Sequence, residues 1–346
     1  MGLQSSLPEA RAGDVLGGLS DSFGRLAGKL RVSVTDRCNF RCDFCMPEAP
    51  AFLDQSEVLT FEEVTRVTAV LATMGVAKVR VSGGEPLVRR DVERLVGMLS
   101  RVRGIKSVSM TTNGALLKGK AAALKSSGLK GVTVSLHSLR PELYDEITGT
   151  KDMFSRVMEG IAEAERVGLG PVKVNCVVTR GCNEGEILDF ARMAHDSGRV
   201  VRFIEYMPFD GTKFWDTGMV VPGSEIVAAI SARYPLEPLA GERGSTSTNY
   251  RFADGSEGTI GTITSMSRPF CGDCDRIRLK ANGNIVPCLF SVAEYDLKHL
   301  LRGGASDEEL ESAVRRAFSQ KFEGVGSLME NKVEVRHIRP MYTIGG

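Results

Sequence analysis

No run of apolar residues in the sequence approaches the roughly 20 that a membrane-spanning helix needs. A charge excess of either sign is also lacking, because 44 Lys and Arg are balanced by 43 Asp and Glu, which leaves a net charge of +1. These absences argue against a membrane protein and against binding of duplex nucleic acid through a broad positive field. An anionic ligand must therefore be bound by a local group of cations.

The length of 346 residues suggests two domains, or one large barrel with an appendage. Apolar residues make up 42% and charged residues 25%, the balance of an ordinary globular protein. Residues 1–27 are rich in Gly, Ser and Leu and lack the continuous apolar core of a signal peptide. Glu9, Asp14 and Asp21 argue against a transit peptide, which is poor in acidic residues. We expect 1–27 to be a flexible tail of a cytoplasmic protein.

Strand and helix patterns alternate six times between Leu30 and Met207. Short β-branched runs predict strands at 30–35, 78–82, 107–112, 131–136, 172–179 and 200–206. Amphipathic spacing predicts helices between them at 61–74, 91–102, 153–167 and 186–197. The clearest is 61–74, where Thr60 and Glu63 are spaced as a capping box. This alternation predicts parallel strands joined by right-handed crossovers.

One face of these strands is polar, and this feature distinguishes an incomplete barrel from a fully covered sheet or a closed eight-stranded barrel. In the first strand Val32 and Val34 alternate with polar residues, and the next four strands repeat this alternation. Strands covered by helices on both faces are apolar throughout, and a closed eight-stranded barrel is filled by apolar side chains. We therefore expect an incomplete (βα)6 TIM-like barrel around a wet cavity that holds a ligand. The sixth strand fits poorly, because Arg202 and Glu205 have opposite parity.

The pattern changes after Met207. Residues 208–245 are interrupted by Gly and Pro, with one short helix near 224–232. Residues 250–290 have the pattern of β-hairpins with turns at Asp254-Gly255 and Asn282-Gly283, and a helix follows near 306–321. The sequence thus predicts an α/β protein with a hairpin-rich C-terminal extension covering the barrel opening. The expected units are the tail 1–27, a barrel 28–245 and a C-terminal domain 246–346.

Eight cysteines stand at 38, 42, 45, 176, 182, 271, 274 and 288, and six of them form two tight groups. This grouping favours metal or cluster binding in a reducing compartment over a disulfide framework. Cys38, Cys42 and Cys45 have the spacing C-x3-C-x2-C, directly after the first strand. Three thiolates can bind three irons of a 4Fe–4S cubane and leave the fourth iron open. The alternative is zinc, which favours x2 or x4 spacings and four protein ligands.

The second group consists of Cys271, Cys274 and Cys288, and the Asn282-Gly283 turn folds Cys288 back toward the other two. A second three-thiolate cluster competes here with a zinc site completed by a His. Of the remaining thiols, Cys176 lies on the apolar face of its strand and is expected in the core, and Cys182 lies in a loop.

Two further patterns accompany the cysteines. Ser82-Gly83-Gly84-Glu85-Pro86 ends the second strand, where the glycines allow the backbone to approach a ligand and Glu85 could accept from an amine. Arg276 and Arg278 alternate with apolar residues next to the second cysteine group, so both guanidiniums share one face. Arg pairs bind phosphate oxygens in this way, although a solvated hairpin face would show the same pattern.

The first cysteine group together with Gly83-Gly84-Glu85-Pro86 resembles the radical S-adenosylmethionine superfamily. The resemblance implies that the open iron of the first cluster chelates the amino and carboxylate groups of S-adenosylmethionine. An electron from the cluster then cleaves the sulfonium and releases a 5′-deoxyadenosyl radical, which abstracts a substrate hydrogen.

A more specific resemblance runs from about Gly28 to the C-terminus. The segments 30–38, 268–271, 274–278 and 287–290 and the terminal Gly345-Gly346 are similar to the GTP 3′,8-cyclase family, also called molybdenum cofactor biosynthesis protein A. The resemblance implies a lyase in which the radical takes the 3′ hydrogen of the ribose of GTP and the carbon radical attacks C8 of guanine. The product, (8S)-3′,8-cyclo-7,8-dihydroguanosine 5′-triphosphate, is the first intermediate of molybdenum cofactor biosynthesis.

This resemblance also implies roles for individual residues. The open iron of the second cluster is expected to bind guanine, and the positions that match GTP contacts are Arg31, Arg80, Thr111, Lys173, Arg276, Ile277 and Arg278. The positions that match S-adenosylmethionine contacts are Phe44, Gly84, Ser135 and Met207. The expected catalytic residues are Arg31, Arg276, Arg278, Gly345 and Gly346; in the family the Gly-Gly tail enters the cavity and supports cyclisation. His137 departs from the family, which usually has Asp there.

The implied partners are GTP, an electron donor such as flavodoxin or ferredoxin, and cyclic pyranopterin monophosphate synthase as the next enzyme. No nucleic acid or membrane partner is expected, and a homodimer is one of the states left open. Two alternatives remain: a radical S-adenosylmethionine enzyme that modifies a peptide, and a zinc-stabilised binding protein without redox chemistry. Peptide-modifying relatives commonly have more C-terminal cysteines, and the iron content separates the zinc protein from both enzymes.

Overall fold

The computed structural model describes residues 17–209, 214–330 and 339–345. Its centre is one curved sheet with the strand order β12-β11-β10-β1-β2-β3-β4-β5-β6-β9-β8-β7. The strands are β1 (Lys29–Ser33), β2 (Lys78–Ser82), β3 (Ser107–Thr112), β4 (Gly131–Ser135), β5 (Lys173–Val178), β6 (Val200–Glu205), β7 (Leu236–Pro238), β8 (Thr248–Phe252), β9 (Thr259–Ile263), β10 (Arg276–Leu279), β11 (Asn284–Val286) and β12 (Tyr295–Asp296). β1 to β6 pair in parallel in sequence order, which confirms the predicted incomplete barrel.

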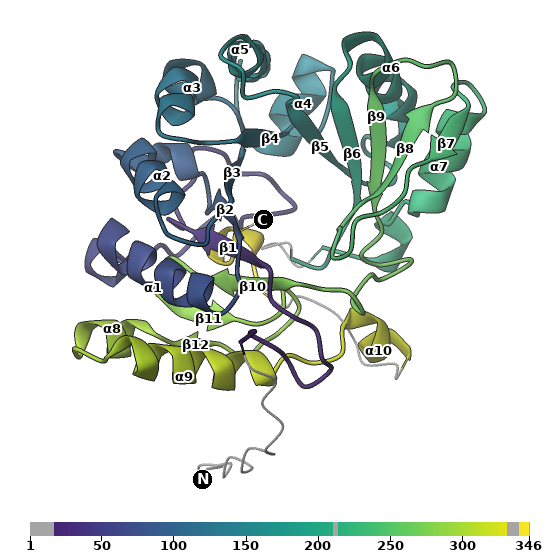
Figure 1. Ribbon diagram of the computed structural model, residues 1–346. Helices are drawn as coiled ribbons and strands as arrows, with labels where there is room; N and C mark the ends of the chain where they lie inside the picture. Colours follow the sequence, from purple (N-terminus) through teal and green to yellow (C-terminus); the bar gives the residue numbers. More distant parts are fainter. Residues whose placement is uncertain (1–16, 210–213, 331–338, 346) are drawn as a thin grey trace.

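The helices that connect these strands lie along the outer side of the curved sheet, and the C-terminal end of the chain lies on its inner side (Figure 1). The α-helices are α1 (Phe61–Thr73), α2 (Val92–Ser100), α3 (Leu117–Ser126), α4 (Pro141–Thr148), α5 (Phe154–Arg166), α6 (Ile187–Ser197), α7 (Gly223–Ser231), α8 (Lys298–Arg302), α9 (Asp307–Ser319) and α10 (Val325–Glu330). The 3-10 turns are η1 (Gln55–Glu57), η2 (Pro86–Val88), η3 (Glu184–Glu186), η4 (Thr217–Met219) and η5 (Met341–Thr343).

Helix α1 shows how local sequence and packing agree. Thr60 Oγ1 accepts from the Glu63 backbone N–H at 3.1 Å and the Glu63 carboxylate accepts from the Thr60 N–H at 2.7 Å, so the predicted capping box is confirmed. Val64, Val67 and Leu71 are fully buried against the sheet. Burial of each such side chain stabilises the fold by about 1.5–3 kcal/mol.

The predicted hairpins form, but they lie at opposite ends of the sheet rather than together. Hairpin β8–β9 joins through β9, which runs parallel to β6, and hairpin β10–β11 joins through β10, which runs parallel to β1. Ile277 and Leu279 continue the buried apolar face of β1, and this places Arg276 and Arg278 on the inner face. The C-terminal half therefore widens the sheet at both edges and brings its loops over the inner side.

The mixed parity of β6 has a structural reason. Arg202 lies on the inner face, as the rule for the other strands requires. Glu205 is buried on the opposite side, where its carboxylate accepts from the backbone N–H groups of Gly223, Met266 and Ser267 at 2.8–2.9 Å. A buried carboxylate with several hydrogen bonds is stabilised, so Glu205 fixes the loop after β9.

The expected flexible N-terminal tail differs from the structure over residues 17–27; the rest of it, 1–16, lies outside the described residues. Ser20 and Leu26 form a β-bridge, and Leu19 is fully buried. Arg25 pairs with Asp21 at 2.5 Å and donates to the carbonyl groups of Cys271, Phe322 and Glu323. These long-range contacts, which the local composition does not reveal, hold this segment against the C-terminal region.

Candidate active site

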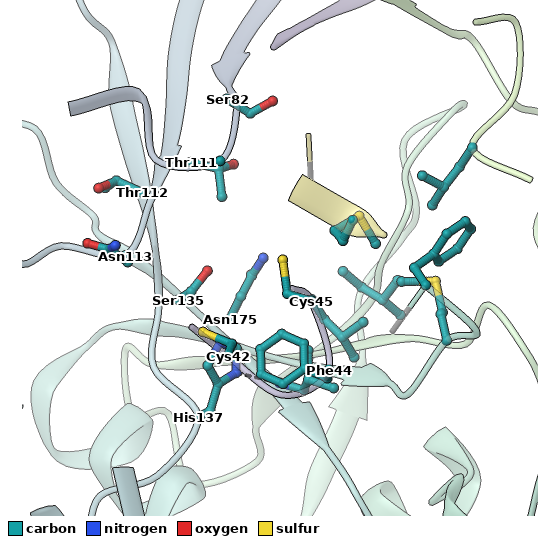
Figure 2. A pocket seen from close by; sticks show the side chains of 18 of the residues that line it. Cys42, Phe44, Cys45, Ser82, Thr111, Thr112, Asn113, Ser135, His137 and Asn175 are labelled. Carbon is teal, nitrogen blue, oxygen red and sulfur yellow. Dashed lines mark hydrogen bonds between the residues drawn. The ribbon is translucent and has the colours of Figure 1, made fainter. Parts of the chain in front are cut away.

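A cavity of about 270 Å³ lies on the inner side of the sheet, at the carboxyl ends of its parallel strands. Figure 2 shows Ser82, Thr111, Ser135 and Asn175, from four neighbouring strands, around the same space as Phe44 and Cys45. Ligand sites of barrel enzymes are built at this end of the strands. The polar face predicted from strand alternation therefore lines a cavity.

The first three cysteines line this cavity together. Burial is the main cause that raises the pKa of Cys38 to about 11 and that of Cys45 to about 12. Burial, followed by the charges of Cys45 and Cys38, also raises the pKa of Cys42. Phe40 N–H donates to Cys38 Sγ at 3.4 Å, a contact that supports a thiolate. A cluster that binds here must displace the thiol protons.

The Gly83-Gly84 pair also allows close loop packing, a role that the sequence does not predict. A Cβ on Gly83 would lie 2.6 Å from the Thr35 carbonyl oxygen, and one on Gly84 would lie 2.4 Å from that of Arg37. Gly84 N–H also donates to the Thr35 carbonyl at 2.6 Å. The glycines thus let the loop after β2 pack against the backbone that leads into Cys38, while their other side lines the cavity.

The side chain of Glu85 connects the ends of β2 and β3. Its carboxylate accepts from Thr112 Oγ1 at 2.7 Å, from Asn113 N–H at 2.6 Å and from Leu87 N–H at 2.9 Å. Burial raises the pKa of Glu85 to about 7 although these hydrogen bonds lower it. Most of its acceptor capacity is used within the protein, so a role as amine acceptor is secondary.

The second group of cysteines, Cys271, Cys274 and Cys288, lines a smaller cavity of about 70 Å³. Five residues line both cavities, namely Ser265, Phe270, Arg276, Arg278 and Leu289. Burial raises the pKa of Cys274, but the charges of Arg276 and Lys321 outweigh it and lower the pKa to about 6. Arg276 Nε also donates to Cys274 Sγ at 3.4 Å. This site favours a thiolate.

The two cysteine groups lie at opposite ends of the β1–β10 pair. β1 leads into Cys38 at its carboxyl end, whereas Cys274 precedes β10 and Cys288 follows β11 at the amino end of that pair. The five residues of β1, at about 3.3 Å each, span about 16 Å between these ends. Arg31 and Arg278 are paired midway along the strands.

Each cysteine group supplies three thiols at the edge of a cavity. Within the described ranges, no three His, Cys, Asp or Glu side chains are close enough to bind one metal ion. In a cubane each thiolate binds a different iron, so the sulfur atoms surround the cluster instead of meeting at a point. The three thiols of the first group, Cys38, Cys42 and Cys45, would hold such a cluster.

The cavity holds a group of arginines without acidic partners. Arg31, Arg80, Arg202, Arg276 and Arg278 all line it, and in the described part of the chain none of them pairs with a carboxylate. Burial lowers the pKa of Arg31 well below its usual value, and the charges of Arg278, Arg80 and Arg276 lower it further. Buried cations of one sign repel each other, so the site favours an anionic ligand.

Most residues predicted for the site lie around this cavity. Its lining includes Arg31, Phe44, Arg80, Gly84, Thr111, Ser135, Met207, Arg276 and Arg278. Lys173 is not in the lining, although burial and then the charges of Arg202 and Arg80 lower its pKa to about 8. The side chain of Ile277 is fully buried in the core, which leaves its backbone as the part that can meet a ligand.

The C-terminal tail reaches the same arginines. Arg278 Nη1 donates to the Gly345 carbonyl at 2.9 Å, and Met341 N–H donates to the Phe209 carbonyl at 3.0 Å. Ile344 is 1% exposed, so it anchors the tail by burial. Gly345 therefore lies next to Arg278, a cavity residue, and Gly346 lies outside the described residues.

Sequence reasoning missed Arg202, Asn175 and His137, which also line the cavity. Arg202 has a buried Nε without a partner. The strand alternation in the sequence could have identified Arg202 and Asn175, because both stand at positions on the polar face of their strands. His137 shares the parity of Ser135 and was noted only as a departure from the family.

The environment of His137 fixes its protonation. Its Nδ1 accepts from the Val177 backbone N–H at 3.2 Å, and its ring packs edge-on against Phe44 with centroids 4.7 Å apart. Burial lowers the pKa of His137 to about 4, so the ring is neutral and carries its hydrogen on Nε2. An Asp side chain could accept the same N–H.

Comparison with protein families agrees with both halves of the site. A model described as Radical SAM superfamily matches residues 32–194, and one described as Molybdenum Cofactor Synthesis C matches 199–326. The crystal structure of Streptococcus suis SuiB aligns with a TM-score of 0.60 at 17% identity and covers 85% of this chain and 69% of that one. At this identity the likeness shows the fold alone. Among the described helices, none has the length and apolar character to cross a membrane.

Other relatives are much more similar in sequence to this chain than SuiB is. The GTP 3′,8-cyclase of Acidothermus cellulolyticus is 42% identical over 313 residues, 88% of this chain and 86% of that protein. The GTP 3′,8-cyclase of Pelotomaculum thermopropionicum is 43% identical over 88% of this chain and 94% of that protein. Human molybdenum cofactor biosynthesis protein 1 is 42% identical, and this chain spans about half its length, 48%. At this identity and coverage, the chain belongs to the GTP 3′,8-cyclase family of radical S-adenosylmethionine enzymes.

Proposed function

We propose that this protein cyclises GTP to (8S)-3′,8-cyclo-7,8-dihydroguanosine 5′-triphosphate, the first step of molybdenum cofactor biosynthesis. The observation that carries this proposal is a group of cavity arginines that have no carboxylate partner among the described residues and lie between two cysteine triads. A nucleoside triphosphate supplies the missing negative charge. Its purine and its phosphates extend far enough to contact both ends of the cavity.

The first triad holds a 4Fe–4S cluster, as radical S-adenosylmethionine enzymes require. When bound, this cluster supplies the electron that cleaves the sulfonium of S-adenosylmethionine. Phe44, Ser135 and Met207 line the space next to the cysteines. In our proposal Ser135 donates to the sugar of the cofactor, Phe44 packs on its apolar surface, and Gly84 leaves room for its methionyl end.

The second cluster, at Cys271, Cys274 and Cys288, is the part of the proposal that is specific to the substrate. Its support is the shared lining of the two cavities and the lowered pKa of Cys274. An open iron on this cluster would face the space beside Arg276 and Arg278. There it could bind a nitrogen or oxygen of guanine and fix the base.

In our proposal, different cations contact different parts of the nucleotide. Arg80 is held in place by Thr111 Oγ1 at 3.3 Å and Thr133 Oγ1 at 3.0 Å, and with Lys173 it is suited to the phosphates. Arg31 and Arg278 lie midway between the two triads and are suited to hold the ribose and inner phosphates. Precise placement of C3′ and C8 between two bound ligands is catalysis by proximity.

Further proposals follow from membership in this family. We place the enzyme in the cytoplasm, because all eight cysteines are free thiols and a reducing compartment preserves them. A flavodoxin or ferredoxin is proposed as its electron donor, and cyclic pyranopterin monophosphate synthase as the enzyme that takes its product. The proposed domain division is 1–27, 28–245 and 246–346.

The test is anaerobic incubation of the iron-loaded protein with GTP, S-adenosylmethionine and dithionite. We expect 5′-deoxyadenosine and cyclised GTP in equal amounts. A matched reaction with ATP should give little cyclised product, because the base is selected at the second triad. If intact clusters yield neither 5′-deoxyadenosine nor cyclised GTP, the proposed function is wrong.

A further inference from the structure

Lys321 is one of the largest fully buried side chains in the protein, with 2% of its surface exposed. It follows the end of α9, and its Nζ donates to the carbonyl oxygens of Cys274 at 3.0 Å and Arg276 at 2.9 Å. The ammonium also lies 4.8 Å from the centre of the Phe318 ring. The two carbonyls belong to the segment that joins the second cysteine triad to β10.

A buried ammonium needs a negative partner, because transfer of an isolated charge out of water is strongly unfavourable. Within the described ranges Lys321 has no carboxylate partner. The acidic groups nearby are committed elsewhere: Asp21 pairs with Arg25 and Asp275 pairs with Lys29. The carboxyl end of α9 and the two carbonyls supply only partial charge.

These two hydrogen bonds attach Lys321 to the backbone of the second triad, whose three cysteines line one small cavity. Burial lowers the pKa of Lys321, and the charges of Cys274 and Cys288 oppose that effect. As ligands of a cluster, the three cysteines of this triad are thiolates. As three thiolates they outweigh the two positive charges of an oxidised 4Fe–4S core, so the centre is an anion, and its reduction adds a further negative charge.

We propose that Lys321 is the counter-ion of a cluster at Cys271, Cys274 and Cys288 and raises its reduction potential, an inference that rests on the proposed second cluster. Lys321 acts as a positioning residue, since its ammonium contacts the backbone of Cys274 and Arg276 and its side chain lines neither cavity. The charge favours the reduced, more negative state of the cluster.

Two substitutions separate the charge from the hydrogen bonds. In Lys321→Gln the side-chain amide keeps N–H donors for the two carbonyls and loses the charge, whereas Lys321→Arg keeps the charge and changes the shape. The readout is an anaerobic redox titration of the full-length, two-cluster protein followed by electron paramagnetic resonance. The first cluster, at the far end of the β1–β10 pair, serves as the internal reference. A protein with Ser at Cys38, Cys42 and Cys45 assigns the signal of the second cluster.

We expect Lys321→Gln to shift the midpoint potential of the second cluster to a more negative value, with the first cluster unchanged, and Lys321→Arg to restore it. An unchanged potential in Lys321→Gln, or an equal shift in both clusters, overturns the inference. If Lys321→Gln loses the second cluster's iron, retention of that iron in Lys321→Arg supports the role of the charge, and its loss from both overturns it. Absence of any 4Fe–4S signal from the Cys38, Cys42 and Cys45 variant instead refutes the second cluster itself.

Discussion

The substitution Gly345→Ala tests how tightly the C-terminal tail is fitted into the cavity. Gly345 has φ +78°, a conformation that favours glycine. A Cβ there would lie 2.6 Å from Ser82 Oγ, 3.3 Å from Ser33 Cβ and 3.4 Å from the Gly83 nitrogen. Neither the φ angle nor the space accepts a side chain, so the tail must move.

The cost follows from two contributions. Placing Ala in the left-handed region costs about 1–2 kcal/mol. Displacement of the Gly345 carbonyl from Arg278 Nη1, now 2.9 Å away, removes a hydrogen bond to a charged group that contributes about 1.5–3 kcal/mol. The sum is about 3 kcal/mol, which lowers the equilibrium constant for docking of the tail by about 100-fold.

Two measurements check this estimate. Digestion of the C-terminus by carboxypeptidase should be up to about 100-fold faster in Gly345→Ala. The ratio of cyclised GTP to 5′-deoxyadenosine should fall while the iron content stays at the wild-type value. Gly185→Ala is the control, since nothing lies within 4 Å of a Cβ at that position. Wild-type digestion and cyclisation rates in Gly345→Ala would refute the fitted tail.

Three further predictions concern the surroundings of the site. In Gly324→Ala the new Cβ lies 2.2 Å from Cys271 Cβ at φ +153°, so we expect iron to fall from about eight to about four per chain, whereas Gly326→Ala, with its nearest atom 3.7 Å away, should keep it. Glu294→Gln removes the carboxylate that pairs with both Lys280 and Arg339. Loss of these ion pairs should weaken the attachment of the C-terminal segment by about 1 kcal/mol, so its digestion should become several-fold faster. Hydrogen bonds to Asp196 and Asp254 raise the pKa of His195 in the folded protein. Protonated His195 therefore stabilises the folded state fully at a pH below its usual pKa, and this contribution is lost as the pH rises through the raised pKa. His195→Gln should therefore lower the unfolding midpoint at pH 6 and leave it unchanged at pH 9; an equal loss at both would contradict this assignment.

The barrel was predictable because its signal is local. Each strand from β1 to β5 shows its buried and polar faces in consecutive residues, and α1 shows its cap within four residues. The pairing of β10 with β1 was not predictable, because it joins segments about 250 residues apart and depends on register. Helix α3 was missed because only Leu117, Ala121 and Leu124 face the core among lysines and alanines.

Those parts of the site that depend on the spacing of residues along the sequence were predictable, whereas those that depend on tertiary packing were less so. The two cysteine triads and the Arg276–Arg278 pair follow from spacing in the sequence. The purpose of Gly83 and Gly84 does not, because the backbone they contact belongs to another loop, residues 35–37. Lys321 likewise reads as a surface lysine after a helix, and only its tertiary contacts show that it is buried.

The parallel pair β1–β10 unites these elements. Its register sets Arg31 beside Arg278, its carboxyl end leads into the first triad, and its amino end adjoins the second. A parallel pair hydrogen-bonded on both sides cannot slip by one residue without turning Arg31 and Arg278 from the cavity into the core. The spacing between the two triads along this pair is therefore fixed by backbone pairing, and the tail is held beside Arg278 by its hydrogen bond from that guanidinium. For the proposed reaction, which depends on placing C3′ and C8, the sheet supplies the rigid spacing.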